Sequence, residues 1–155
     1  MKWNLEELTE DALVAYLQGL CPGEYRISAA WARDEIEYPA VLVHAESSEP
    51  ISEPAEWHDP RQLSVSVAVV TEGAHEIDPT SGLIIKTARE RNQEARSAVM
   101  DALFVSDLNA QLVAQGVEDI AFSMAQFADT QRSTEDRNLI TTITGTVIAE
   151  PVTGS

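Results

Sequence analysis

The segment from Gln62 to Thr71 constrains the fold of this chain more than any other. Larger apolar side chains alternate there with smaller or polar ones, in the order Leu63, Val65, Val67 and Val69 against Ser64, Ser66, Ala68 and Val70. Successive side chains of a β-strand point to opposite faces of the sheet, so this period of two predicts a strand with one covered face and one wet face. We expect it to pair antiparallel with the strand before it, because sheets with one wet face are commonly antiparallel.

An amphipathic helix is predicted from residue 5 to residue 20, where apolar side chains recur at helical spacing. Asn4 and Glu7 are placed to cap its first turn. The run Cys21-Pro22-Gly23 should end it, because proline cannot continue the helical hydrogen bonds and glycine readily adopts a C-terminal cap.

A second helix is expected from about Lys86 to Phe104. Its apolar face is mostly alanine, which is small enough to let the helix lie close on a sheet. A shorter helical turn, capped by Asp107, should span Leu108 to Gln115 before Gly116 ends it.

The other strands are predicted from runs rich in β-branched and aromatic residues. They are Tyr25–Ala32, Tyr38–Ala45, a segment that begins at Ile120, and Leu139–Glu150. The last two should form a long hairpin with a polar apex from Thr130 to Arg137, and Glu72–Gly82 is expected to be a loop because it carries two glycines and a proline.

The segment from Glu46 to Arg61 is predicted to be a long mobile arm. It contains three prolines, only Ile51 and Trp57 as bulky apolar residues, and the acids Glu46, Glu49, Glu53, Glu56 and Asp59. Such a composition supplies little that a core could bury.

These elements predict an α+β fold. We expect a mainly antiparallel sheet of about four strands flanked by two main helices, with a long acidic loop arm and a long C-terminal hairpin. The 155 residues fit one domain spanning residues 1–150, with the arm at 46–61 and a frayed tail at 151–155.

Charge excludes some classes of partner. The 26 Asp and Glu residues against 10 Lys and Arg give a formal net charge of -16. A field of that sign opposes binding to phosphate backbones and to anionic membranes, so neither sequence-specific nucleic acid binding nor membrane binding is expected. No secretory signal or membrane-spanning run is visible, and the lone Cys21 excludes an internal disulfide.

The sequence carries none of the familiar enzyme motifs, neither a phosphate loop, a dinucleotide fingerprint nor a nucleophile elbow. His44, His58 and His75 lack the close spacing of ligands on one helix, although a dispersed metal site stays open. His58-Asp59 has the residue types of a general base, but in an acidic loop such neighbours need no catalytic cause. We therefore expect no catalytic residue, no cofactor and no metal, and a protein that is not an enzyme.

Two groups of residues are candidates for a subunit or partner interface. One is a basic helix face with Lys86, Arg89, Arg91 and Arg96. The alternative interpretation of this group is a charged helix face that only contacts solvent. The other comprises Trp57, His58 and Arg61 of the arm with Arg132 and Arg137 of the hairpin apex, although a loop Trp often folds back on its own domain. The acids Glu46, Glu49, Glu53, Glu56 and Asp59 are the candidate acidic arm or lumen.

The order of these elements resembles that of the tail-terminator (minor tail, or tail-completion) proteins of long-tailed bacteriophages. The resemblance is one of pattern and covers most of the chain, and it is carried by Tyr38–His44, Gln62–Val70, Ala88–Leu103 and Arg137–Glu150. It implies a structural virion protein that joins as a homo-hexamer ring, caps the finished tail tube and stops tube polymerisation.

The same resemblance implies the partners and the location. They are further copies of the chain, the tail tube protein and a head-completion or neck protein, at the head-tail junction of a virion assembled in the host cytoplasm. DNA passes through such a ring, and an acidic lumen would repel it so that it slides. The arm is then expected to order on contact with a neighbour.

Three alternatives stay open at this stage. One is a neck or head-completion connector protein on the other side of the same junction. A second is a small non-viral ligand-binding α+β module, which predicts a well-formed apolar pocket with convergent polar groups. An enzyme is the third, because the absence of motifs does not disprove one.

Overall fold

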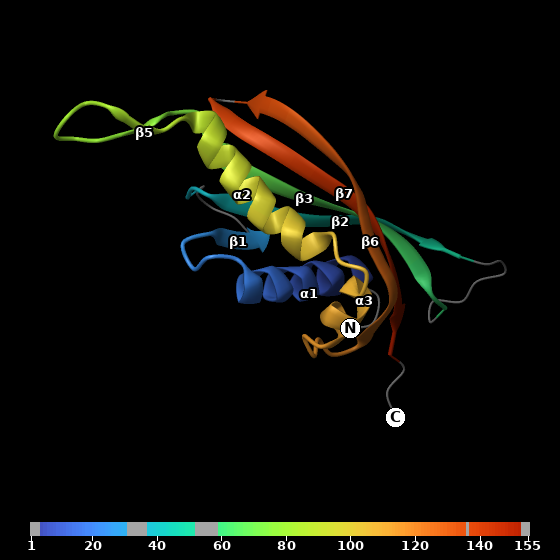
Figure 1. Ribbon diagram of the computed structural model, residues 1–155. Coiled ribbons are helices and arrows are strands. Elements are labelled where there is room, and N and C mark those ends of the chain that lie inside the picture. Colours follow the sequence, from blue (N-terminus) through green and yellow to red (C-terminus); the bar gives the residue numbers. More distant parts are fainter. Residues whose placement is uncertain (1–3, 31–36, 52–58, 136, 153–155) are drawn as a thin grey trace.

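A computed structural model describes residues 4–30, 37–51, 59–135 and 137–152 (Figure 1). It has a curved five-stranded sheet, three helices that cover one face of that sheet, and a small hairpin that projects from the body. In chain order the elements are α1 Leu5–Leu20, β1 Arg26–Ala29, β2 Ala40–Pro50, β3 Arg61–Glu72, β4 Glu76–Ile77, β5 Ile84–Lys86, α2 Ala88–Leu103, α3 Leu108–Val113, β6 Ile120–Glu135 and β7 Asn138–Pro151.

The strand order in the large sheet is β1-β2-β3-β7-β6. β1 pairs parallel with β2, and every other pairing is antiparallel, so the predicted α+β class with a mainly antiparallel sheet is confirmed. β4, within the segment expected to be a loop, pairs with β5, just beyond that segment, to form a separate two-stranded ribbon.

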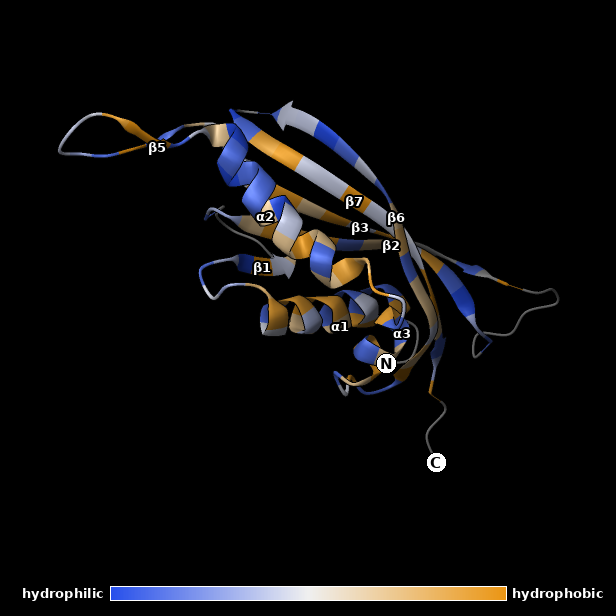
Figure 2. Ribbon diagram, viewed as in Figure 1, coloured by the Kyte–Doolittle hydropathy of each residue, from blue (hydrophilic) through white to orange (hydrophobic). Residues whose placement is uncertain are grey.

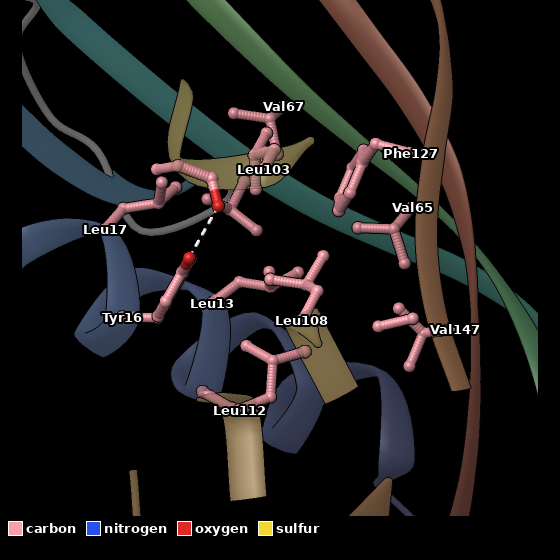
Figure 3. Packing of buried hydrophobic residues seen from close by; sticks show 14 of the residues in the cluster. Leu13, Tyr16, Leu17, Val65, Val67, Leu103, Leu108, Leu112, Phe127 and Val147 are labelled. Carbon is pink, nitrogen blue, oxygen red and sulfur yellow. Dashed lines mark hydrogen bonds between the residues drawn. The ribbon is translucent and has the colours of Figure 1, made fainter. Parts of the chain in front are cut away.

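The alternation along β3 sets the position of the core. Leu63, Val65, Val67 and Val69 are all buried and face the helices, as their period predicts. They pack with Leu13 and Leu17 of α1, Leu103 of α2, and Leu108 and Leu112 of α3 (Figure 3). The hydroxyl of Tyr16 donates to the carbonyl of Ala102 within this cluster and ties α1 to the end of α2.

Both main helices occupy the predicted segments, and their caps differ in detail. Asn4 does not cap α1 through its side chain; its amide donates instead to Glu7 Oε2 at 3.3 Å. α2 begins at Ala88 rather than Lys86, because Thr87 accepts a hydrogen bond from the Glu90 N–H at 3.1 Å and so acts as the N-cap. Asp107 precedes α3 without a side-chain cap bond to the backbone.

The bounds predicted for the arm, Glu46 to Arg61, are wrong at both ends, because β2 extends to Pro50 and β3 begins at Arg61. Residues 46–50 continue β2, and Glu49 pairs with Gln62 across a bulge. Backbone hydrogen bonds to β3 hold these strand ends, so they need no apolar side chains. Glu53, Glu56, Trp57 and His58 lie outside the described residues.

The hairpin apex expected from Thr130 to Arg137 is also wrong. β6 extends to Glu135 and β7 begins at Asn138, so only a tight turn remains, with Arg137 at a φ of 64°. Residues 128–135 are all exposed, and a strand with water on both faces shows no apolar period. At the other end, Pro151 belongs to β7 rather than to a frayed tail, and residues 153–155 lie outside the described residues.

Candidate assembly surfaces

The face of the sheet that the helices leave uncovered carries many hydroxyl, amide and acidic side chains, with apolar residues such as Leu42, Ile140 and Ile148 among them. The strand registers place the following residues on it: His44, Glu46, Gln62, Ser64, Ser66, Thr142, Thr144, Thr146, Gln126, Asp129 and Gln131. Among the described residues of β2, β3, β6 and β7, this face carries no Lys or Arg. Arg26 of β1 lies at its margin and pairs with Glu37 at 2.7 Å.

A shallow depression of about 650 Å³ occupies the middle of this uncovered face. Its charged lining residues are Glu46 and Asp129, and serines, threonines and glutamines supply most of the rest. Such a surface accepts and donates hydrogen bonds while it repels anions. Glu46, predicted as part of an acidic arm or lumen, lies here, and its Oε1 is 3.3 Å from Nε2 of His44.

The predicted interface residues divide into two ends of the molecule. Arg61 lies at the start of β3, beside the end of β2, with Glu49 and Asp59. Lys86 and Arg89 lie at the β5–α2 junction, near the end of the sheet where β6 turns into β7, and Arg96 lies midway along α2. We call the second group, together with Arg91, Arg132 and Arg137, the basic end.

Within the basic end the structure brings Arg89 of α2 together with Arg132 of β6. Both line a depression of about 400 Å³ whose floor includes Asn92, Leu139 and Ile140. In the part of the chain that the structure describes, no carboxylate forms an ion pair with Arg89, Arg96, Arg132 or Arg137.

Two other cations of the basic end are already engaged. Lys86 Nζ lies 2.9 Å from Glu94 Oε2, and this hydrogen bond raises the pKa of the lysine. Arg91 donates to the carbonyl of Ala74 at 3.1 Å and so fastens the base of the β4–β5 hairpin to α2. Arg89 and Arg132 are therefore the better placed of the predicted residues to meet a partner.

The β4–β5 hairpin is an assembly feature that the sequence pattern did not reveal. It projects beyond the helices, and its hydrophobic residues form a visible apolar stretch (Figure 2). The large apolar side chains Ile77, Leu83, Ile84 and Ile85 are all more than half exposed. Three consecutive apolar residues after Gly82 were the available signal.

The turn of this hairpin is held by hydrogen bonds rather than by a core. The backbone N–H of Thr80 donates to Asp78 Oδ1 at 2.8 Å, which lowers the pKa of that carboxyl. Gly82 donates its N–H to the Asp78 carbonyl and has a φ of 73°, a conformation that favours glycine. The apolar side chains are thus presented on a defined turn.

The corner between α2 and α3 carries a different apolar surface. Phe104 is 43% exposed and lines, with Val105 and Met124, a depression of about 460 Å³. Exposed Asp101 and Asp107 lie three residues to either side of Phe104 in the sequence. No Lys or Arg occurs between residues 97 and 131, so this corner is apolar and acidic.

A buried asparagine and a buried glutamate, which sequence reasoning missed, fix the helices on the sheet. Asn92 of α2 donates to Thr71 Oγ1 at 2.8 Å and accepts from the Thr141 hydroxyl at 3.2 Å. Glu10 of α1 accepts from the Ala45 N–H at 2.8 Å, two residues beyond the last β1–β2 pair. Their positions within otherwise apolar helix faces were the available signal.

Residue types that bind metal ions do not cluster in the described part of the chain. No group of three or more His, Cys, Asp or Glu in that part could hold a metal ion. His75 accepts a hydrogen bond from the Ala88 N–H at 2.9 Å and so caps α2, while His44 lies between Glu10 and Glu46. Burial raises the pKa of the Cys21 thiol, which disfavours the reactive thiolate. Among the described residues no helix is both long and apolar enough to span a membrane.

The fold is similar to that of one chain in a solved structure described as the virion of a native gene transfer agent particle. The TM-score is 0.53, the sequence identity is 12%, and the match covers 91% of this chain and 93% of that chain. No protein-family model matches the sequence, and no curated protein is significantly similar to it.

Proposed function

We propose that this chain is a structural virion protein that caps the tail tube of a phage or phage-like particle as a ring. In this role it ends tube polymerisation and forms the surface on which the head-completion or neck protein docks. The chain performs no catalysis in this account. Its partners are further copies of itself, the tail tube protein and the neck protein.

One observation carries the proposal: a chain from a virion particle has this fold along nearly its whole length, 93% of that chain against 91% of this one. Nearly all of each chain is therefore included in the match. The predicted resemblance to tail terminators came independently from the order and pattern of the elements. The two lines of reasoning agree on a virion protein, and the terminator role is the finer step that we propose.

The uncovered sheet face supports the proposal physically. A surface of hydroxyls, amides and carboxylates, with Glu46 and Asp129 at its centre, does not adhere to phosphate. If this face lines the ring, DNA moves past it without binding. The net negative charge of the whole chain would then also keep DNA from binding.

The alternatives predict different surfaces. A ligand-binding module calls for an apolar pocket with a few convergent polar groups. The depression on the uncovered sheet face is instead shallow, and most of its lining residues are polar. A neck protein has the same assembly features as a terminator, so these two roles are separated by experiment.

Tail length distinguishes a terminator from a neck protein. In particles produced without this chain, we expect tail tubes that are over-long or widely scattered in length when measured by electron microscopy. Tails of normal length that fail to join heads would assign the chain to the neck. Intact infectious particles would remove it from the junction altogether.

A further inference from the structure

The apolar side of the β4–β5 hairpin is left uncovered in the described part of the chain. Leu83 is 70% exposed, and Ile77, Ile84 and Ile85 are each 54% or 55% exposed. Soluble proteins seldom expose several large apolar side chains together unless a partner covers them. A two-stranded ribbon of this size also buries too little to be stable alone, so its order depends on its turn and on its attachment to α2.

The hairpin itself carries two carboxylates: Glu76 is opposite Lys86 in the ribbon, and Asp78 accepts from the Thr80 N–H. The cations that can meet a partner's carboxylates lie beside the hairpin. Arg89 and Arg132 lie on the adjoining surface of the basic end, and no described carboxylate pairs with either. An apolar surface flanked by free arginines is complementary to an apolar surface flanked by carboxylates.

The chain itself has such a surface at the α2–α3 corner. Phe104 and Val105 supply the apolar part, and the exposed Asp101 and Asp107 supply the carboxylates. Residues 97–131 contain no cation, so the segments that form the corner would not repel the basic end.

The two surfaces lie at opposite ends of α2. The helix has 16 residues, which separates them by about 24 Å at 1.5 Å per residue. A hairpin that projects away from the body cannot reach the far end of its own helix. Contact between the two surfaces therefore requires a second copy.

We propose that the β4–β5 hairpin of one copy docks at the α2–α3 corner of the next copy. Leu83, Ile84 and Ile85 would cover Phe104 and Val105, while Arg89 and Arg132 face Asp101 and Asp107. This contact is head-to-tail, and head-to-tail contacts close into rings when the rotation between copies allows it. The inference rests on the ring proposed above and names its subunit interface.

Disulfide trapping tests this contact directly. The variant Leu83→Cys with Phe104→Cys places one thiol on the hairpin and one at the corner, in a Cys21→Ser background that removes the native thiol. The matched control is Leu83→Cys with Leu20→Cys, because Leu20 is 60% exposed at the end of α1 and away from the corner. Both proteins are concentrated and oxidised under conditions that allow thiol–disulfide exchange. The products are then separated by gel electrophoresis without reductant.

The expected result is a ladder of cross-linked species beyond the dimer and loss of most of the monomer band, in the first variant only. Equal cross-linking in both variants, or none in either, would overturn the docking. If cross-linking fails while particles made without this chain still have over-long tails, the hairpin contact is wrong and the terminator role stands.

Discussion

Asn92 shows how a single buried polar side chain decides where α2 lies on the sheet. Its amide bonds to Thr71 of β3, to the Leu139 carbonyl and to Thr141 of β7 at distances of 2.8 to 3.2 Å. All four residues are buried or half-buried, so water does not readily replace these partners. The helix is thereby fixed in rotation as well as in position, which also sets the place of Arg89 beside Arg132.

Asn92→Ala should therefore lower the free energy of unfolding by about 2–3 kcal/mol, because it leaves buried hydroxyl and carbonyl groups without partners. Urea denaturation measures the change. The neighbouring exposed Gln93→Ala is the matched control and should stay within about 0.5 kcal/mol of the parent. Equal effects from the two substitutions would contradict a structural role for the Asn92 network.

Glu10 has a comparable role on α1. Its carboxylate is 2% exposed and accepts from Ala45, whose N–H lies on the edge of β2 that β1 no longer covers. Glu10→Ala should cost about 1–3 kcal/mol of unfolding free energy, whereas Glu10→Gln keeps an acceptor oxygen and should cost less. The exposed Asp11→Ala serves as the control in the same denaturation series. Equal losses in the glutamine and alanine variants would show that the charge, not the hydrogen bond, is what matters.

At the scale of elements, the β4–β5 hairpin depends on its turn. The Thr80 N–H holds the pKa of Asp78 below its ordinary value, so the ionised carboxylate is the form that the folded turn favours. The contribution of Asp78 to the turn is therefore present above the ordinary carboxyl pKa of about 3.9 and is lost as the pH falls through the lowered pKa.

The Thr80 amide proton reports this titration in NMR spectra. We expect its chemical shift to change with a midpoint below about 3.9. In Asp78→Asn the same proton should show no such titration, because the amide oxygen accepts the bond without ionising. A midpoint at or above the ordinary value in the parent protein would mean that the carboxylate does not hold the turn.

The elements that sequence predicts well are those whose side chains are buried on one side only. α1 and β3 have that property, so their periods of about four and of two are visible along the chain. Glu46, Glu49 and residues 128–135 are exposed; hydrogen bonds between backbones hold these segments in β2 and β6, and no side-chain pattern indicates that. The β4–β5 ribbon was missed for a related reason. Its strands have few residues and do not contribute to the core, so they show no period, and the glycines and Pro79 of this segment indicated a loop.

The assembly surfaces were predictable only in part. The basic residues of α2 stand out in an acidic sequence, yet their grouping with Arg132 depends on the register of β6 against β7 and on the docking of α2 through Asn92. Both are contacts between segments that lie far apart in the chain. The sequence therefore identifies these basic residues, but it does not show that they lie together in the fold.

At the scale of the whole molecule, the cations are concentrated at one end, where they lie among carboxylates such as Glu72, Glu90 and Glu135. Six of the 10 Lys and Arg residues lie at the basic end, whereas the far end carries acids such as Glu46, Glu49, Asp101 and Asp107 and has Arg61 as its described cation. Copies with a net charge of -16 repel one another in any arrangement that does not match unlike ends. Head-to-tail contact is the arrangement that does match them.

Reversal of one charge at the basic end should therefore weaken self-association. We expect Arg132→Glu to raise the concentration needed for assembly about tenfold at low salt, and less at high salt where charges are screened. Arg61→Glu makes the same change in net charge at the start of β3, at the other end of the sheet, and should have a smaller effect. Analytical ultracentrifugation compares the two. Similar losses in both variants would point to overall charge rather than to a specific contact.

The central claim is that this chain forms a ring at one end of the tail tube. Electron microscopy of particles that carry a gold-labelled copy of the chain tests it most directly. Label is expected at a single position, between the end of the tube and the head. Label distributed along the tube, or particles that contain none of the chain, would contradict it.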